Sequence, residues 1–142
     1  MKKPALHLED DRMCYVCGKD NTHGFRLDFS HPKKNHMFAE VVFQKYHQGY
    51  KGIVHGGILA MMLDEIMINL AWKEGLPAVT ADLGVRLKKA AKIGHKVRFE
   101  GFIDRVEGRA VYAHAAAHDE EGRLLATAQA TCIRIKTAPD TA

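Results

Sequence analysis

The chain has 142 residues, of which 46% are hydrophobic and 27% charged, enough for one globular core but not for two. Its net charge of +4 comes from 21 Lys and Arg against 17 Asp and Glu, which permits an anionic ligand. The basic residues are not interleaved with stacking aromatic residues, so we expect no nucleic-acid partner. No apolar stretch reaches the ~18 residues of a membrane span, and the charged start lacks the apolar run of a signal peptide. We therefore expect no membrane partner and a cytoplasmic location.

Residues 1–23 carry a Cys-x-x-Cys pair, Cys14 and Cys17, but little hydrophobic periodicity, and we assign them as an N-terminal extension. A zinc site would need two more ligands, and the nearby histidines do not form a second close pair: His23, His31 and His36. The prediction is therefore a turn with two small, buried cysteines and no metal. Three cysteines, an odd number, do not suggest a disulfide framework and fit a reducing compartment.

Two strands are expected before the first helix. Apolar alternation predicts them at residues 25–29 and 37–43, with a turn at 31–35 between them. A loop punctuated by glycines, at 46–52, then leads into the helix.

The stretch from Gly52 to Trp72 is the one around which the chain is organised. Its helix is apolar on nearly every side, so it must be covered almost completely. On a wheel of about 100° per residue, Glu65 groups with Asn69 on a wetter face, whereas Asp64 lies among small and apolar residues. A carboxylate in such surroundings is costly unless it is paired or used. Asp64 is therefore the first candidate for a functional residue.

Four strands are expected after the helix, which Gly75 and Pro77 end. Alternation and turn pairs place them at 78–89, 96–106, 109–118 and 124–135. In the first of these, strict alternation predicts two faces, one with Ala81, Leu83, Val85 and Leu87, the other with Thr80, Asp82, Gly84, Arg86 and Lys88. Residues 137–142 are expected to form a frayed tail.

Alanines mark the sheet that covers this helix. Three share one face of a strand and three share one face of the next: Ala113, Ala115 and Ala117, then Ala126, Ala128 and Ala130. Small side chains let a curved sheet close tightly on a bulky helix. We therefore expect an α+β hotdog fold in one domain, residues 24–142, with a long central helix wrapped by a curved, mostly antiparallel six-stranded sheet.

The start of the helix and Asp64 together predict a shared site. A helix N-terminus presents unpaired N–H groups and a partial positive charge, which suit an oxygen that gains negative charge in acyl transfer. Gly57 and Asp64 are separated by a rise of about 10.5 Å at 1.5 Å per residue, so one carbonyl group cannot touch both. In a symmetric dimer with antiparallel helices, Gly57 of one chain would lie near Asp64 of the other. We expect a homodimer, or a dimer of dimers, with shared active sites.

The run His55-Gly56-Gly57 followed by Asp64 resembles the signature of the hotdog acyl-CoA thioesterases of the 4-hydroxybenzoyl-CoA thioesterase superfamily, in its phenylacetyl-CoA thioesterase-like branch. The resemblance runs from residue 24 onward and is more specific for the fold than for thioester hydrolysis. It implies an acyl-CoA thioesterase that releases free acid and CoA without a metal or organic cofactor.

The resemblance also implies roles for the motif residues. The Gly57 N–H, beside His55, would polarise the thioester carbonyl. Asp64 of the partner chain would act as a nucleophile or as a general base on a water. Thr80 matches a position at which a hydroxyl helps to place the attacking water.

Three groups of residues are expected to contact the substrate. The family often has an asparagine six residues before the motif histidine, where this chain has Gly49, with Gln48 beside it as a possible source of the amide. Met61, Met62 and Ile68 would line the acyl site, and Gly56 is a further expected substrate contact. The CoA phosphates need cationic partners, for which the candidates are Arg86, Lys88, Lys89, Lys92 and Arg134.

Two other functions remain open. A hotdog hydratase would need a histidine paired with an acid, and neither an Asp-x4-His nor a His-x-Phe-Pro-Gly run occurs here. A hotdog protein that binds acyl-CoA without reacting, as a sensor or scaffold, usually lacks the helix carboxylate that this chain has.

Overall fold

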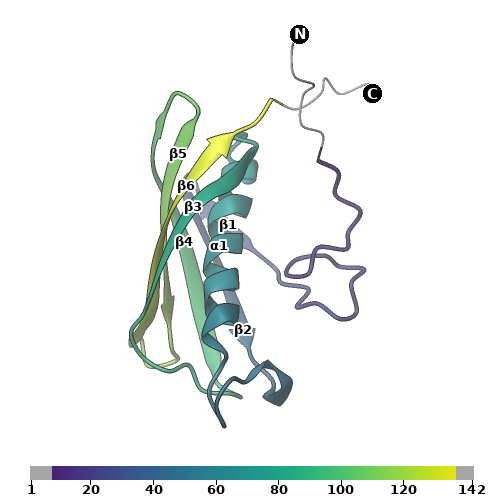
Figure 1. The fold of residues 1–142 in the computed structure, drawn as a ribbon, viewed down its shortest axis with the longest axis vertical. Coiled ribbons are helices and arrows are strands. Elements are labelled where there is room, and N and C mark those ends of the chain that lie inside the picture. Colours follow the sequence, from purple (N-terminus) through teal and green to yellow (C-terminus); the bar gives the residue numbers. More distant parts are fainter. Residues whose placement is uncertain (1–7, 137–142) are drawn as a thin grey trace.

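The computed structural model describes residues 8–136, in which one long helix lies along one face of a curved sheet (Figure 1). The helix is α1 (Gly56–Lys73), and a short 3-10 helix, η1 (Lys45–His47), precedes it. The strands are β1 (Ser30–Lys33), β2 (His36–Val42), β3 (Ala78–Leu87), β4 (Lys96–Glu107), β5 (Ala110–His118) and β6 (Leu124–Arg134). All neighbouring strands are antiparallel, in the order β1-β2-β4-β5-β6-β3. The expected α+β architecture is confirmed.

The helix packs on the alanine faces of β5 and β6, as the sequence predicted. All six alanines are buried, and β4 contributes Gly101 opposite Ala115. A Cβ on Gly101 would lie 3.3 Å from Cγ2 of Ile66 and 3.4 Å from the Ile66 carbonyl oxygen. The absence of larger side chains therefore brings the backbone of α1 close to the sheet.

The first strand lies later in the chain than predicted. Residues 25–29 are not a strand, because they pair with the N-terminal segment: the Phe25 and Leu27 N–H groups donate to the carbonyls of Tyr15 and Val16, and Arg26 has a positive φ of 50°. β1 begins instead at Ser30, one residue before the predicted turn, and its remaining residues overlap that turn. The turn is tighter than expected, since Asn35 adopts a φ of 62° directly before β2.

β3 departs from strict alternation at one position. The ladder with β6 pairs Thr80 with Cys132 and Asp82 with Thr131, and its register shifts between them, so that Ala81 is the extra residue of a β-bulge. Cys132 is fully buried on the inner face, and Thr80 therefore faces α1. The expectation that Thr80 shares a face with Asp82 is wrong, because the bulge reverses the alternation between them.

Two peripheral parts of the fold bear on the site, the edge strand and the N-terminal segment. β3 is an edge strand, and three of its apolar side chains are partly exposed: Val79, Leu83 and Leu87. On the side of α1 away from the sheet, residues 8–28 form an irregular segment (purple in Figure 1). This segment is anchored by the buried side chains of Val16 and Leu27.

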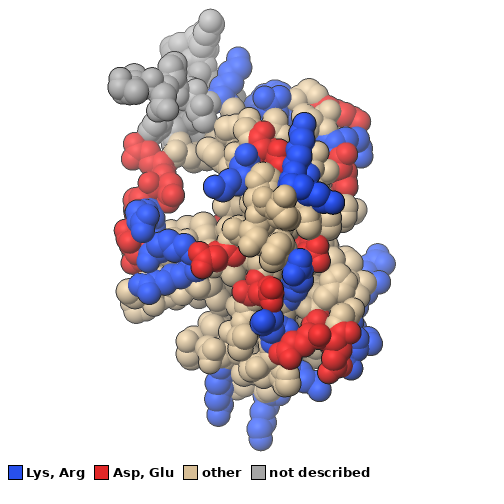
Figure 2. All heavy atoms as spheres, turned by 180° about the vertical axis from the view of Figure 1, so that it is seen from behind, with Lys and Arg blue, Asp and Glu red and all other residues tan. Residues whose placement is uncertain are grey.

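The surface carries charges of both signs. Acidic and basic side chains are interspersed over the face seen in Figure 2, so neither sign dominates it. Within residues 8–136, no helix has the length and apolar character needed to cross a membrane. The predicted tail at 137–142 lies outside the described residues, and the boundary between residues 1–23 and the domain 24–142 stays a prediction.

Packing of the helix on the alanine face can be tested with two adjacent residues of β5. Ala115 faces inward and is 2% exposed, whereas Ala116 faces outward and is half-buried. Ala115→Val should lower the free energy of unfolding by about 1–3 kcal/mol through overpacking. Ala116→Val should change it by less than about 0.5 kcal/mol. Denaturant titration at a fixed chain concentration measures both, and equal stabilities would contradict the close packing described here.

Candidate active site

The start of α1 opens into a groove that brings together six of the expected site residues. They are Gly49, His55, Gly56, Gly57, Lys88 and Lys89, and apolar residues such as Ile53, Leu59 and Leu87 line the rest. The groove thus combines a helix N-terminus, two basic residues and an apolar wall.

His55 caps the helix and determines which amide is free. The Gly57 N–H donates to His55 Nδ1 at 2.9 Å, and the Ile58 N–H donates to the His55 carbonyl at 3.0 Å. A neutral His55 ring with Nδ1 as acceptor carries its proton on Nε2. Within residues 8–136 the Gly56 N–H has no hydrogen-bond acceptor. The unpartnered amide is therefore one residue earlier than the Gly57 amide that the sequence suggested.

Gly49 and Gln48 support the loop that carries His55. A Cβ on Gly49 would lie 3.3 Å from the His55 Cα and 3.5 Å from its Cδ2, so glycine leaves room for the imidazole. The Gln48 side-chain oxygen accepts from the Gly52 N–H at 3.1 Å. Gln48 is thus engaged in holding its own turn.

Asp64 lies on a different part of α1 from the groove. Its side chain contacts the edge strand β3. Its Oδ1 accepts a hydrogen bond of 2.7 Å from the Thr80 hydroxyl, and both side chains are half-buried. Beneath them, Cys132 has a raised pKa because it is buried and because the Asp64 charge is near, while the Thr80 hydroxyl acts in the opposite direction. No sequence motif connects Cys132 with this site, whereas its pairing with Thr80 across the ladder does.

The helix start and the carboxylate remain separate within one chain. Asp64 is absent from the residues that line the groove, as its position two turns further along α1 requires. Each chain therefore presents an amide at one place and a carboxylate at another.

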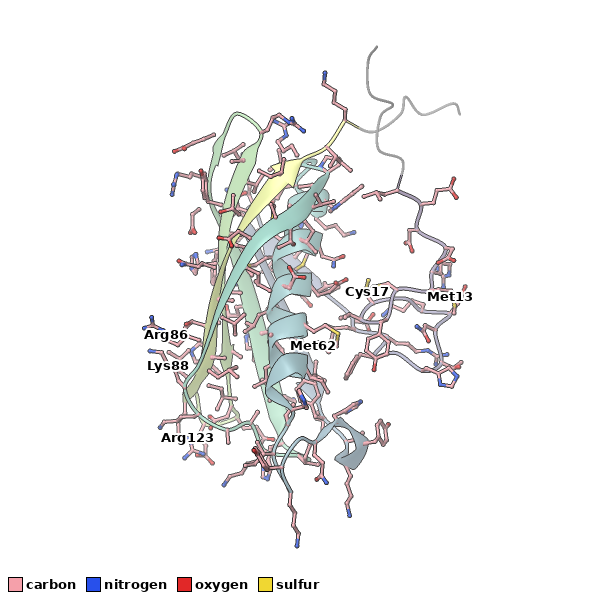
Figure 3. All side chains as sticks on the ribbon, in the orientation of Figure 1. Met13, Cys17, Met62, Arg86, Lys88 and Arg123 are labelled. Carbon is pink, nitrogen blue, oxygen red and sulfur yellow. The ribbon has the colours of Figure 1, made fainter. Side chains whose placement is uncertain are left out.

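The basic candidates divide between several surfaces. In Figure 3, Arg86 and Lys88 project from the outer side of the sheet, away from α1, and both border a hollow on that side. Lys88 borders the groove as well. Arg134 lies at the opposite end of β6 from Leu125, whose carbonyl accepts from the Lys88 and Lys89 N–H groups. Arg134 is therefore distant from the groove.

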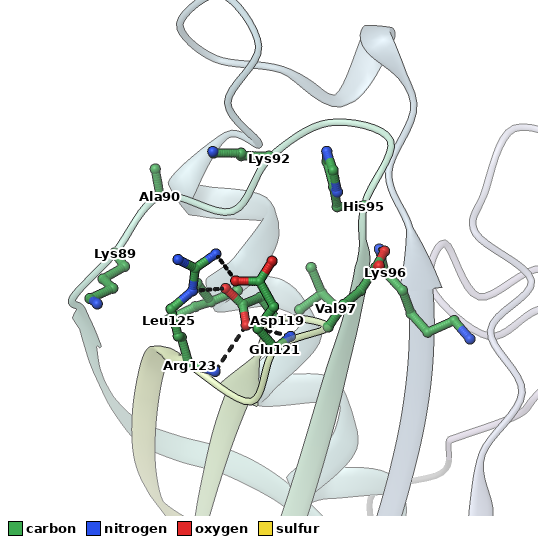
Figure 4. Close-up of a pocket in the computed structure, with 11 residues that line it drawn as sticks. Lys89, Ala90, Lys92, His95, Lys96, Val97, Asp119, Glu121, Arg123 and Leu125 are labelled. Carbon is green, nitrogen blue, oxygen red and sulfur yellow. Dashed lines mark hydrogen bonds and ion pairs between the residues drawn. The ribbon is translucent and has the colours of Figure 1, made fainter.

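Lys89 joins the groove to a neighbouring pocket, shown in Figure 4. This pocket also holds Lys92, a further candidate, and Arg123. The Arg123 guanidinium is paired with Asp119 at 2.7 Å and Glu121 at 2.6 Å, so its charge is already balanced. Lys88 and Lys89 line the groove itself, and Lys92 lies in the pocket that adjoins it.

The expected acyl-lining residues lie outside the groove, and Met62 is fully buried in the core. Met61 is half-buried and packs against the core. Ile68 lines a different pocket, together with Cys14, Cys17 and Glu65. Glu65 is half-buried rather than on an open wet face, because residues 8–28 cover it.

Known proteins resemble this chain in sequence. The family model described as the thioesterase superfamily matches residues 51–126. Acyl-coenzyme A thioesterase THEM4 of Rattus norvegicus is 32% identical over 93 residues, covering 66% of this chain and 40% of the relative. The chain thus spans about two fifths of the length of that curated relative.

Solved structures show the same fold. A thioesterase superfamily protein superimposes with a TM-score of 0.82 at 20% identity, covering 86% of this chain and 60% of that one. A hypothetical thioesterase protein with coenzyme A, from Streptococcus pneumoniae TIGR4, has a TM-score of 0.73 at 19% identity, covering 79% and 91% of the two chains. Two further structures of that protein carry alanine in place of one aspartate and of one threonine.

The predicted hotdog fold is confirmed by these structural likenesses. The matched residues include the helix motif and Asp64, and they make up more than half of the sequence. The chain belongs to the thioesterase superfamily.

Proposed function

We propose that this chain hydrolyses the thioester of an acyl-CoA to a free acid and CoA. The observation that carries the proposal is the half-buried Asp64 carboxylate, held by the Thr80 hydroxyl on the helix whose start presents an unpartnered Gly56 N–H. The THEM4 relative is named as an acyl-coenzyme A thioesterase, and the Streptococcus pneumoniae structure contains coenzyme A. A cytoplasmic location, expected from the sequence, is part of this proposal.

The helix N-terminus supplies the electrophilic half of the site. The thioester carbonyl oxygen accepts from the Gly56 N–H, and it gains negative charge when the carbon becomes tetrahedral. The partial positive charge of the helix start stabilises that charge. His55 keeps the Gly57 N–H occupied and orients this turn, and its Nε2–H remains available as a second donor.

Asp64 supplies the activating half. With Oδ1 engaged by Thr80, the other carboxylate oxygen can take a proton from water, whose oxygen adds to the carbonyl carbon while CoA leaves as the thiol. Alternatively, the Asp64 carboxylate attacks the carbonyl carbon first, the carbon–sulfur bond breaks so that CoA leaves as the thiolate and takes up a proton, and water then hydrolyses the resulting anhydride. In a single turnover in ¹⁸O-labelled water, direct attack places ¹⁸O in the product acid, whereas hydrolysis of the anhydride at the Asp64 carbon places it in Asp64.

The aspartate and threonine replaced in the Streptococcus pneumoniae protein support these roles. The two residues are 16 positions apart in that protein, the same separation as that between Asp64 and Thr80. The spacing matters because it is set by the helix end, the connection and the start of the edge strand.

The complete site is shared between two chains in this proposal. The rise from Gly56 to Asp64 exceeds the reach of one carbonyl group. The free edge of β3, with its partly exposed apolar side chains, is a surface that a second copy would cover. A twofold axis then pairs the helix start of one chain with the carboxylate of the other, twice per dimer.

Replacement of the carboxylate tests the chemical assignment. Asp64→Asn keeps the size of the side chain and an oxygen that accepts from Thr80, but it removes the base and the nucleophile. We expect kcat for hydrolysis to fall by about 10²–10⁴, measured as thiol release over a panel of aromatic and medium-chain acyl-CoAs. Undiminished hydrolysis would refute the role of Asp64. Binding of an acyl-CoA by the wild type without any cleavage would favour the sensor or scaffold function.

Removal of one amide tests the electrophilic half. Proline is favoured at the first position of a helix, so Gly56→Pro deletes the N–H with little change to the backbone. Gly56→Ala is the matched control, because its Cβ meets the same Leu87 methyl, 2.7 Å away, but the N–H remains. We expect kcat to be lower by about 10²–10³ in the proline variant than in the alanine variant. Equal rates would exclude the Gly56 N–H as the donor.

Mixing the two defective chains tests sharing of the site. A mixed dimer of Gly56→Pro and Asp64→Asn chains has one site with both defects and one intact site. Since half of the dimers are mixed after random exchange, we expect about a quarter of the wild-type rate to return. Restoration is impossible if each site lies within one chain. A rate equal to the sum of the separate variants, in a sample whose mixed dimers are confirmed by mass spectrometry, would contradict a shared site.

A further inference from the structure

A second cluster of reactive side chains lies where residues 8–28 meet α1. The sulfur atoms of Cys14 and Cys17 each lie 3.4 Å from Oε1 of Glu65, and the three donor atoms are all within 4.8 Å of one another. Figure 3 shows Cys17 on the segment beside the helix. No other group of three such donors is this close in the described part of the chain.

The separations match those of a metal coordination shell. Tetrahedral zinc has Zn–S distances of about 2.3 Å and Zn–O distances of about 2.0–2.2 Å, which place sulfur and oxygen ligands about 3.5 Å from each other. Both sulfur–oxygen distances here are 3.4 Å. Both sulfur–oxygen separations therefore suit ligands of one shared ion.

The loop that carries the cysteines is folded tightly around their sulfur atoms. The Cys17 N–H donates to Cys14 Sγ at 3.4 Å, and the Gly18 N–H donates to the Cys14 carbonyl at 2.9 Å. A Cβ on Gly18 would lie 2.4 Å from the Cys14 backbone nitrogen, so only glycine fits there. Amide donors to sulfur stabilise a thiolate more than a thiol.

Glu65 is oriented for the same point. Asn69 Nδ2 donates to Glu65 Oε1 at 2.8 Å and to the Glu65 carbonyl at 2.9 Å. No Lys, Arg or His of residues 8–136 forms an ion pair with Glu65. A half-buried carboxylate that faces two sulfur atoms thus lacks a positive partner, which a bound cation would supply.

We propose that Cys14, Cys17 and Glu65 bind one zinc ion, with water in the fourth position. On binding, the two thiols lose two protons, and two thiolates, one carboxylate and Zn²⁺ give a site of net charge −1. The sequence pattern predicts no metal, because no second pair of histidines completes the site and Glu65 falls on the wetter face of the helix. The ligand comes instead from the helix that the Cys-x-x-Cys loop covers.

The ion would fasten residues 8–28 to α1 rather than take part in hydrolysis. Glu65 and Asp64 are adjacent but diverge by about 100° around the helix. Asp64 faces Thr80 on the edge strand, and Glu65 faces the N-terminal segment. The zinc site does not depend on the proposed thioesterase activity.

Metal content of the reduced, full-length protein tests the proposal. We expect about one zinc per chain by plasma mass spectrometry after exposure to zinc and dialysis. Cobalt substitution should give a thiolate-to-metal charge-transfer band and the intense visible bands of a tetrahedral site. Glu65→Gln and Cys17→Ser should each weaken zinc binding by at least about tenfold in competition with a chromophoric chelator.

Two variants serve as controls. Asp64→Asn changes the neighbouring acid and Cys132→Ala removes the remaining thiol, and both should retain one zinc. If the ligand variants fail to fold, zinc and cobalt titrations of the wild type still decide the question. The proposal is overturned if fully reduced wild type binds no zinc, if Glu65→Gln binds zinc as tightly as wild type, or if cobalt shows no thiolate band. A protein isolated with a Cys14–Cys17 disulfide that, once reduced to the two thiols, takes up no zinc would also overturn it.

Discussion

The constraint on which the structure depends is that α1 is apolar around almost its whole circumference. The sheet covers one side through alanines and Gly101, and residues 8–28 cover part of the other. Burial of this kind leaves no place for an unpaired polar group. Each polar side chain in the middle of the helix therefore has a specific partner: Asp64 has Thr80, and Glu65 has the two cysteines and Asn69.

Much of the fold followed from the sequence because the signals were strong and local. The helix lies where its glycine pair, its apolar length and Gly75 placed it. The four strands after it begin and end within two residues of their predicted limits. Alternating residues and tight turns are properties of neighbouring positions, so a single sequence records them. Asp64 stood out for a similar reason, as a carboxylate among apolar residues.

Other features depend on contacts between distant residues, and these were missed. Phe25 and Leu27 alternate like a strand, but their amides are taken by the N-terminal segment. Helical periodicity places Glu65 on a wetter face, because nothing near it in the sequence covers it. The engagement of the Gly57 N–H by His55 could not be read from residue types either, since it depends on the side-chain conformation.

The bulge at Ala81 has a consequence for variation in this chain. Ala81 is exposed and does not line the groove, so within one chain its identity is free to change. Its presence is not, because removing one residue there would restore strict alternation and turn Thr80 to the outer face. The position is sensitive to length and indifferent to side chain. An alignment column there would look variable while tolerating no gap.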